Sequence, residues 1–406
     1  MLLTASRIVT SECVHSPGWV RIEGDTIVAV GSGDAPAGEW DRRDLGDATL
    51  VPGFVDAHVH GGGGASYPEA AAVGVQAVLA ARAAHLARGT TTTMASLVTA
   101  SSAELLEQVL ALAPLVADGT LCGIHLEGPW LSPERKGAHD EGALRAPDAN
   151  EIDVLLAAAR GAIRMVTIAP ELPGALAAIE RLVAAGVIVA IGHTDADFEQ
   201  TRCAIDAGAT VATHLFNAMP PLLHRAPGPV LALLEDERVT LELVADGVHL
   251  HPELVRFVEQ AAGTDRVMLV TDAMAASASG DGHYRLGSLA VEVHDGVAML
   301  AGTDTIAGST ATMDALFRGG AAVDSGLSRP DAEPGTDRKE TRNFSDASLV
   351  AAVRMTSTNP ARALGLGHVG DIAVGRHADF VVFDDDLRLR EVILAAKTVE
   401  PVAKLR

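Results

Sequence analysis

The sequence has few cysteines and no long apolar run, and each shortage narrows what the protein can be. Its three cysteines, Cys13, Cys122 and Cys203, form no C-x-x-C pair and are odd in number. This argues against a disulfide framework and favours the reducing cytoplasm. The longest apolar run, around Leu182–Ile191, contains a glycine and is too short to span a bilayer, so we expect no membrane contact.

Positive charge is also scarce. The chain has 31 Lys and Arg residues against 53 Asp and Glu residues, for a formal net charge of −22. A surface of this sign repels a phosphate backbone, which argues against nucleic-acid binding. It also repels a phosphorylated metabolite, so an anionic substrate would need a local cluster of positive charge.

The middle of the chain alternates short β-branched segments with longer segments rich in Ala and Leu. This alternation predicts parallel strands separated by helices, and eight such units predict a TIM-like (β/α)8 barrel of the α/β class. The expected strands are 50–55, 90–98, 121–126, 163–168, 187–191, 210–215, 240–245 and 266–271. The expected helices include 70–88, 103–116 and 172–185.

An open, doubly wound sheet is the alternative architecture. It would favour a G-x-G-x-x-G phosphate loop after the first strand. Here that strand is followed by His58-Val59-His60 and four glycines, which does not fit the motif. The barrel is therefore the preferred fold.

The two ends of the chain differ from its middle, because both contain short strand-like segments separated by turns. We expect residues 1–50 and 370–406 to pair into one small β-sandwich domain beside a barrel domain of residues 51–369. The polar segment 325–346 predicts a mobile surface loop that is unusually long for a compact domain.

Six polar residues lie where predicted strands end: His58, His60, Glu127, His193, His214 and Asp272. The C-terminal ends of parallel strands meet at one rim of a barrel, so these side chains should converge. Imidazole nitrogen and carboxylate oxygen suit a borderline divalent ion such as zinc. Such an ion lowers the pKa of its water to about 7, and a nearby carboxylate can take the proton and pass it to a leaving amine. Asp272 is the candidate for this proton transfer.

Each residue taken alone has a simpler interpretation. An isolated H-x-H pair fits a polar loop, and Glu127 fits an ion pair or a helix N-terminus. His193 and His214 fit hydrogen-bonded core histidines, and Asp272 fits a helix cap. The joint pattern favours the metal site, because all six residues follow strand ends and none precedes a strand.

Further polar residues lie in the same loops: His139, Asn217, Arg225, Asp246 and His249. Arg225, beside His224, would supply the positive charge that the rest of the chain lacks, because a guanidinium binds phosphate oxygens in pairs. A surface ion pair is the alternative role for Arg225. His249 would hydrogen-bond a substrate carbonyl or simply close its own loop.

Several strings are similar to those of one known family: P-G-F-V-D-A-H-V-H at 52–60, H-L-E-G-P at 125–129, K-G-A-H at 136–139, G-H-T at 192–194, T-H-L-F-N-A-M at 213–219, A-D-G-V-H at 245–249 and T-D-A at 271–273. They resemble the N-acetylglucosamine-6-phosphate deacetylase family of the amidohydrolase superfamily. The resemblance covers nearly the whole chain. H-x-H is common to many amidohydrolases, whereas H-L-E-G-P and T-H-L-F-N-A-M are far more specific.

The resemblance implies roles for these residues. Glu127, His193 and His214 would hold the principal divalent ion, Zn²⁺ by preference, with Fe²⁺, Mn²⁺ or Co²⁺ as alternatives. A second ion at His58, His60 and Asp272 is compatible with the pattern. Asp272 would be the general acid/base and His249 would polarise the acetyl carbonyl. The sugar phosphate would be bound by Ala138, His139, Asn217, Ala218 and Arg225, with Ile306, Ala307 and Gly308 lining the site. Asp246 and His249 would also contact the substrate. Members are usually homodimers, so Arg225 would reach the partner's site.

The expected reaction is hydrolysis of the acetamide of N-acetylglucosamine 6-phosphate. One alternative is another amidohydrolase: an N-acetylgalactosamine-6-phosphate deacetylase, a D-aminoacylase or a cyclic amidase. Many relatives of the cyclic amidase and D-aminoacylase kinds bridge two metals with a carboxylated strand lysine, and none of the four lysines here lies in a predicted barrel strand. A second alternative is a non-catalytic barrel that binds sugar phosphate, which the intact metal pattern argues against.

Overall fold

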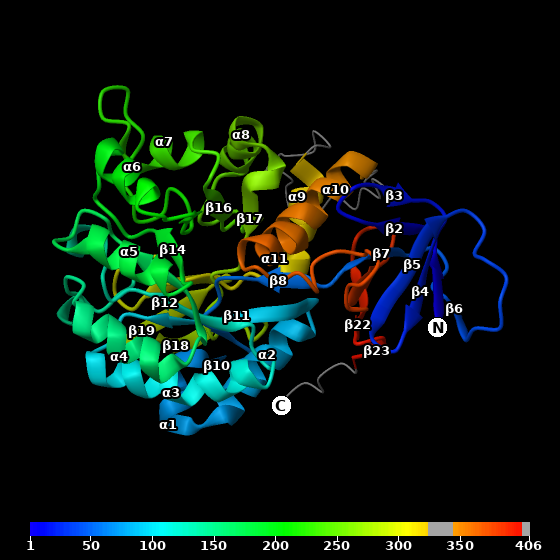
Figure 1. The fold of residues 1–406 in the computed structure, drawn as a ribbon, viewed down its shortest axis with the longest axis horizontal. Helices are drawn as coiled ribbons and strands as arrows, with labels where there is room; N and C mark the ends of the chain where they lie inside the picture. The colour runs from blue at the N-terminus through cyan, green and yellow to red at the C-terminus, as the bar shows by residue number, and fades with distance from the viewer. Residues whose placement is uncertain (324–343, 400–406) are drawn as a thin grey trace.

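The computed structural model describes residues 1–323 and 344–399. It shows a barrel of strands and helices beside a strand-rich unit that contains the N-terminal segment and the last described strands (Figure 1). The segment 325–346, predicted as a mobile loop, lies almost entirely outside the described residues.

The barrel is a sheet of eight parallel strands in the order β17-β16-β15-β14-β13-β12-β11-β8. Its strands are β8 (Phe54–Asp56), β11 (Thr90–Val98), β12 (Gly123–Glu127), β13 (Ile163–Ile168), β14 (Ile188–Ile191), β15 (Val211–Ala212), β16 (Thr240–Leu243) and β17 (Val267–Leu269). Beyond the strand ends, the Asp272 N–H donates to the His58 carbonyl at 2.8 Å, and Val59 forms a parallel bridge with Ala273. These contacts join the two edge strands, and the predicted barrel is confirmed.

Helices surround the barrel (Figure 1). They are α1 (Ala70–Val73), α2 (Val75–Leu86), α3 (Ser102–Ala117), α4 (Ala149–Ala159), α5 (Ala175–Ala184), α6 (Phe198–Asp206), α7 (Gly228–Glu235), α8 (Pro252–Ala262), α9 (Met313–Val323), α10 (Asp346–Val353) and α11 (Asn359–Ala363). The starts of α3 and α6 are fixed by capping boxes, Ser101 with Glu104 and Asp197 with Gln200. None of the helices within residues 1–323 and 344–399 is long and apolar enough to cross a membrane.

Alternation along the strands separates the core from the site. In β12, Ile124 and Leu126 belong to the main apolar core under the helices, whereas His125 and Glu127 lie on the opposite face. A separate apolar cluster, which includes Met165 from β13, collects side chains from most of the barrel strands. The polar residues therefore lie at one end of a packed barrel rather than in an open pore.

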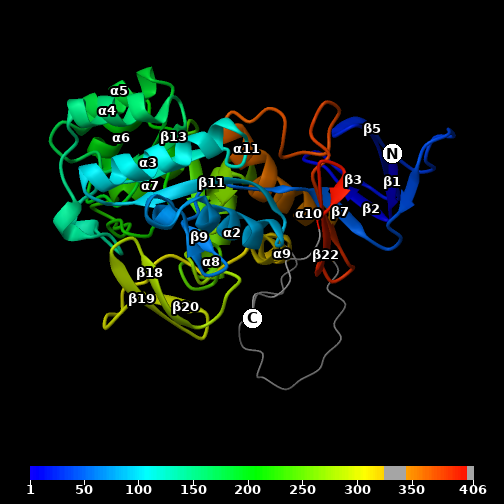
Figure 2. The same ribbon diagram turned by 90° about the horizontal axis from the view of Figure 1, so that it is seen from below.

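A small antiparallel sheet follows the barrel strands and was not expected from the sequence. It contains β18 (Gly282–Leu286), β19 (Leu289–His294) and β20 (Val297–Leu300). Figure 2 shows it on one side of the barrel, away from the terminal strands. Its buried side chains, among them Leu286 and Val291, pack against Met274 and Ala275 in the segment after Asp272.

The strands from the two ends form two further sheets, ordered β5-β4-β1-β6 and β23-β22-β21-β7-β2-β3. These strands are β1 (Leu2–Ala5), β2 (Arg7–Val9), β3 (Val14–His15), β4 (Gly18–Glu23), β5 (Thr26–Ser32), β6 (Arg42–Asp44), β7 (Thr49–Pro52), β21 (Phe380–Phe383), β22 (Leu389–Leu394) and β23 (Lys397–Thr398). Leu3, Val20 and Phe380 belong to one apolar cluster shared by both sheets. A β-sandwich built from both ends of the chain is thereby confirmed, while the boundaries 1–50, 370–406 and 51–369 stay a prediction.

The predicted strand 50–55 proved wrong as a single element. It divides at Gly53, so that β7 joins the terminal sheet and β8 joins the barrel. A Cβ atom at Gly53 would clash with the Thr91 side chain, which explains why glycine stands where the chain passes between the two units.

Replacing Phe383 by Ala tests how the two units are held together. The buried Phe383 ring stacks on Phe317 of α9 with centroids 5.1 Å apart, and Phe54 of β8 lies 6.3 Å from it. Loss of the ring should lower the free energy of unfolding by about 3–5 kcal/mol, measured by urea denaturation. Phe257→Ala is the control, because that ring is 47% exposed and its loss should cost about 0.5 kcal/mol or less. Equal effects of the two substitutions would contradict this account.

Candidate metal centre and active site

The six residues predicted to bind metal converge at the C-terminal rim of the barrel, and all are buried. Glu127 Oε1 lies 3.1 Å from His193 Nε2 and 3.0 Å from His214 Nε2, and these two nitrogens are 3.0 Å apart. Two ligands of one tetrahedral zinc ion are separated by roughly 3.3 Å. The spacing of this first group, which we call the Glu127–His193–His214 group, therefore fits one shared ion.

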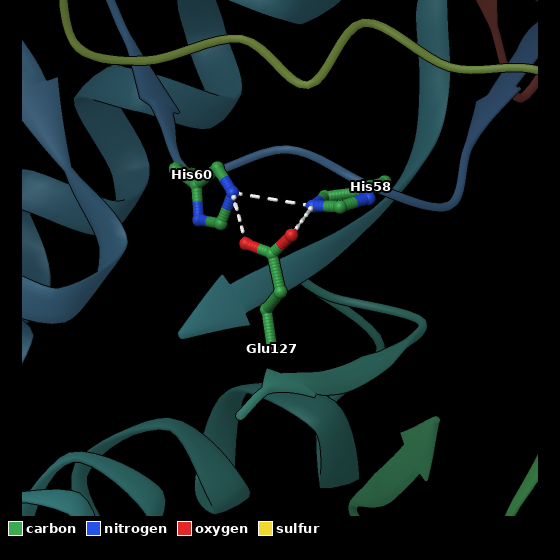
Figure 3. Close-up of side chains that lie close together, drawn as sticks. All are labelled: His58, His60 and Glu127. Atoms are coloured by element: carbon green, nitrogen blue, oxygen red, sulfur yellow. Dashed lines mark hydrogen bonds and ion pairs between the residues drawn. The ribbon is translucent and has the colours of Figure 1, made fainter. Parts of the chain in front are cut away.

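A second group adjoins the first (Figure 3). His58 Nε2 and His60 Nε2 lie 3.2 Å apart and both face Glu127. His60 Nε2 is 3.2 Å from Glu127 Oε2 and from Asp272 Oδ1, and His58 Nε2 is 3.5 Å from Glu127 Oε1 and Asp272 Oδ1. Glu127 thus belongs to both groups. We call this second set the His58–His60–Asp272 group.

The hydrogen-bond partners of the Nδ1 atoms show that each Nε2 atom faces the centre of the site. His60 Nδ1 lies 3.1 Å from the carbonyl oxygen of Ser96, and His193 Nδ1 lies 2.8 Å from that of Arg135. A carbonyl oxygen only accepts, so each Nδ1 carries a hydrogen and a neutral ring turns its Nε2 lone pair inward. His58 Nδ1, 3.1 Å from Glu242 Oε2, has the same orientation. Lone pairs that face one another beside carboxylates fit a cation between them.

The electrostatics of the two groups agree with this geometry. Burial disfavours the charged form of His60, but hydrogen bonds to Asp272 and Glu127 outweigh burial and raise its pKa to about 9. The same two carboxylates raise the pKa of buried His58 well above its usual value. Burial acts to raise the pKa of Glu127 and of Asp272, yet the imidazoles, His58 first, lower both. The site therefore attracts positive charge.

His139 lies beside the same carboxylate but has a different tautomer. Glu127, His139 and His193 form a group compact enough for an ion. However, the Thr99 N–H donates to His139 Nδ1 at 3.3 Å, so a neutral ring carries its hydrogen on Nε2, 3.5 Å from Glu127 Oε2. Burial, with a contribution from His193, lowers the pKa of His139 to about 4 and keeps the ring neutral. Its Nε2 is therefore a hydrogen-bond donor rather than a metal ligand.

Above these groups lies a cleft of about 370 Å³. Most of the predicted substrate residues line it: Ala138, His139, Asn217, Ala218, His249, Ile306 and Gly308. Asp246 lies behind His249, with its Oδ2 2.8 Å from His249 Nδ1. Ala307 is fully buried, and Arg225 is exposed on a loop outside this lining.

Two buried carboxylates support the rim and were missed by the sequence reasoning. Asp56 accepts from the Thr271 hydroxyl at 2.6 Å, next to Asp272 in the chain. Glu242 Oε2 accepts from His58 Nδ1 at 3.1 Å and from the backbone N–H of His214 at 3.2 Å. A charged residue between Leu241 and Leu243 in β16 was the signal that could have revealed Glu242.

Three residues of the two donor groups have unusual backbones. His193, His214 and Asp272 have φ values of +46°, +26° and +49°, in the left-handed region that non-glycine residues seldom adopt. Each such conformation costs on the order of 1–2 kcal/mol. The rim therefore holds its polar side chains in place at the expense of local strain.

Comparisons with known proteins agree with this site. The model of the amidohydrolase family matches residues 49–404. The N-acetylglucosamine-6-phosphate deacetylase of Bos taurus is 36% identical over 380 residues, covering 90% of this chain and 87% of that one. The N-acetylgalactosamine-6-phosphate deacetylase of Escherichia coli O157:H7 is 34% identical over 397 residues, covering 96% and 97%.

Solved structures extend the similarity to three dimensions. A variant of the Mycobacterium smegmatis N-acetyl-D-glucosamine-6-phosphate deacetylase, in complex with N-acetyl-D-glucosamine 6-phosphate, is 52% identical with a TM-score of 0.90, and 98% of each chain is covered. The Thermotoga maritima enzyme of the same name is 30% identical with a TM-score of 0.83, covering 99% of this chain and 100% of that one. This chain belongs to the N-acetylglucosamine-6-phosphate deacetylase family of the amidohydrolases.

Proposed function

We propose that this protein hydrolyses the acetamide bond of N-acetyl-D-glucosamine 6-phosphate, releasing acetate and D-glucosamine 6-phosphate in the cytoplasm. The observation that carries the proposal is the convergence of the Glu127–His193–His214 group beneath a cleft. The 52% identity to a deacetylase whose structure holds this sugar phosphate supports the substrate. The galacto epimer is the second candidate, because one relative at 34% identity acts on N-acetylgalactosamine 6-phosphate by its name.

The donor set favours a divalent metal cofactor. We assign the principal ion to the Glu127–His193–His214 group and a second ion to the His58–His60–Asp272 group. Nitrogen and oxygen donors at this spacing suit Zn²⁺ first, with Fe²⁺, Mn²⁺ and Co²⁺ as alternatives. When bound, such an ion provides a nucleophile from water at neutral pH and polarises the amide carbonyl.

We assign the proton transfer of the reaction to Asp272. Its side chain lines the cleft, and the neighbouring imidazoles keep its pKa below the usual value despite burial. An ionised carboxylate at this position can take a proton from the attacking water and give it to the leaving nitrogen. Amide nitrogen needs that proton because it leaves poorly as an anion.

We assign the polarisation of the acetyl carbonyl to His249. Its Nδ1–H is committed to Asp246 Oδ2 at 2.8 Å, so its Nε2 can donate only when the ring is protonated. Burial acts to lower the pKa of His249, but Asp246 outweighs burial and raises it. The raised pKa favours the protonated ring, which lines the cleft and can then donate to the carbonyl oxygen as negative charge develops on it.

The sugar phosphate is assigned to the upper part of the cleft. His139 offers its Nε2–H, and Asn217 and Ala218 line the cleft from the loop after β15. We assign the phosphate to Arg225 of a second subunit in a homodimer, because Arg225 is exposed outside the cleft of its own chain. Leu222 and Leu223, 45% and 52% exposed on the same loop, offer apolar surface for such a contact.

Metal removal tests the core of this proposal. Glu127→Gln weakens both donor groups at once, so the variant should retain little metal and release acetate only at the background rate. The measurements are acetate release and metal content, before and after chelation and after Zn²⁺ is restored. Glu134→Gln, at a residue that lines the cleft outside both donor groups, is the control and should keep its metal. Full activity of metal-free wild-type protein would rule out the mechanism.

Asp246→Asn should change the pH dependence of the reaction. Without the carboxylate the pKa of His249 falls. As the pH is raised, the ring then loses its proton, and with it the donor, at a lower pH than in wild type. The alkaline limb of the kcat/KM profile should therefore shift toward lower pH, with the fall in activity largest above neutrality. A profile that only scales down, with an unmoved alkaline limb, would show that His249 does not act as a cation.

Arg225→Ala should mainly raise KM for the phosphorylated sugar. A charge-assisted hydrogen bond is worth about 1.5–3 kcal/mol, so the expected rise is roughly 10- to 100-fold with a smaller change in kcat. Arg202→Ala, at an exposed arginine paired with Glu235, is the control and should behave as wild type. Equal losses on phosphorylated and unphosphorylated N-acetylglucosamine would count against a phosphate contact.

A further inference from the structure

One buried carboxylate beneath the site has no role in the chemistry described above. Glu242, in β16, is fully buried, and its Oε2 accepts two hydrogen bonds. One comes from His58 Nδ1 at 3.1 Å and the other from the backbone N–H of His214 at 3.2 Å. A single oxygen thus contacts a member of each donor group.

The second carboxylate oxygen of Glu242, Oε1, is in an unusual environment. Glu242 Oε1 is buried and has no hydrogen-bond partner in the described part of the chain. The ion-pair partner of Glu242 within residues 1–323 and 344–399 is His58. A buried carboxylate is costly unless opposite charge balances it. The negative charge of Glu242 is therefore balanced by whatever cation binds at His58 Nε2, on the opposite side of the imidazole ring.

The Nδ1 atom of His58 has a different kind of partner from the Nδ1 atoms of the other candidate metal-binding histidines. His60 and His193 donate from Nδ1 to backbone carbonyls, and His214 Nδ1 is buried without a partner among the described residues. His58 donates to a carboxylate instead. A carboxylate behind an imidazole fixes its tautomer and makes the inward nitrogen a stronger ligand.

We propose that Glu242 is a positioning residue that makes His58 a metal ligand and so sets the affinity of the His58–His60–Asp272 group for its ion. This rests on the proposed function, which assigns a second ion to that group. Glu242 bonds the backbone of His214 rather than its ring, so the ion of the Glu127–His193–His214 group should depend on it much less.

Glu242→Gln tests this, because glutamine keeps an oxygen in place for both N–H groups but removes the charge. We expect the second Co²⁺ ion to bind about 10- to 100-fold more weakly than in wild type, while the first ion is retained. The measurements are metal content after dialysis against graded free Co²⁺ and the visible absorption bands of the bound Co²⁺. The second ion should return when free Co²⁺ is raised by the same factor.

Two further variants serve as a positive and a negative control. His58→Asn removes the ligand itself and should reproduce the loss of the second ion. Glu151→Gln is the matched control, because it removes a carboxylate that bonds Trp130 Nε1 at 3.3 Å outside both donor groups, and it should keep two ions. If Glu242→Gln does not fold, Glu242→Asp replaces it, because the shorter side chain withdraws the carboxylate from His58 and should give the same loss.

Three outcomes would overturn the proposal: wild-type protein that binds a single Co²⁺ ion, a variant that binds both ions as wild type does, or equal weakening of both ions. None of these measurements involves acetate release. A protein that releases acetate with one ion would keep its proposed function and lose this inference. A protein that shows the expected Co²⁺ binding but releases no acetate would support this inference and lose its proposed function.

Discussion

The carboxylate of Glu127 is the group on which the arrangement of the site depends. Its Oε1 faces His193 and His214, and its Oε2 faces His60, so one side chain belongs to both donor groups. The position after Glu127 must be glycine, because Gly128 has a φ of +84° and a Cβ atom there would clash with the Thr99 side chain. The chain thus turns sharply after β12 and leaves Glu127 at the rim.

The strain of the rim is tolerated because the packing lies elsewhere. His193, His214 and Asp272 have left-handed backbones, whereas the strands below them contribute most of their side chains to buried apolar clusters. Asp56 and Glu242 hold these strained segments through hydrogen bonds to backbone N–H groups. The apolar core stabilises the fold. Part of that stability offsets the cost of the strained backbone that the buried carboxylates hold in place.

The sequence predicted most of the barrel and the convergence of the metal residues, because both follow from local patterns. The strand 90–98 is β11 and 163–168 is β13, since β-branched runs between helical segments are unambiguous there. The split at Gly53 and the sheet β18–β20 were missed, because each depends on distant partners. The roles of Glu242 and Asp56 were missed for the same reason, since their partners lie far away in the chain.

Charge near the cleft is the reason to assign the phosphate of the proposed substrate to a second subunit. The chain carries a net charge of −22, and the cations beside the cleft are largely committed. Arg135 donates to Asp195 at 2.8 Å, and Lys136 pairs with Glu141. The ions assigned to the floor would meet the acetamide, at the opposite end of the proposed substrate from its phosphate. A guanidinium from outside the cleft is therefore the candidate partner of that phosphate, and Arg225, exposed on its loop, is the residue we assign to a neighbouring cleft.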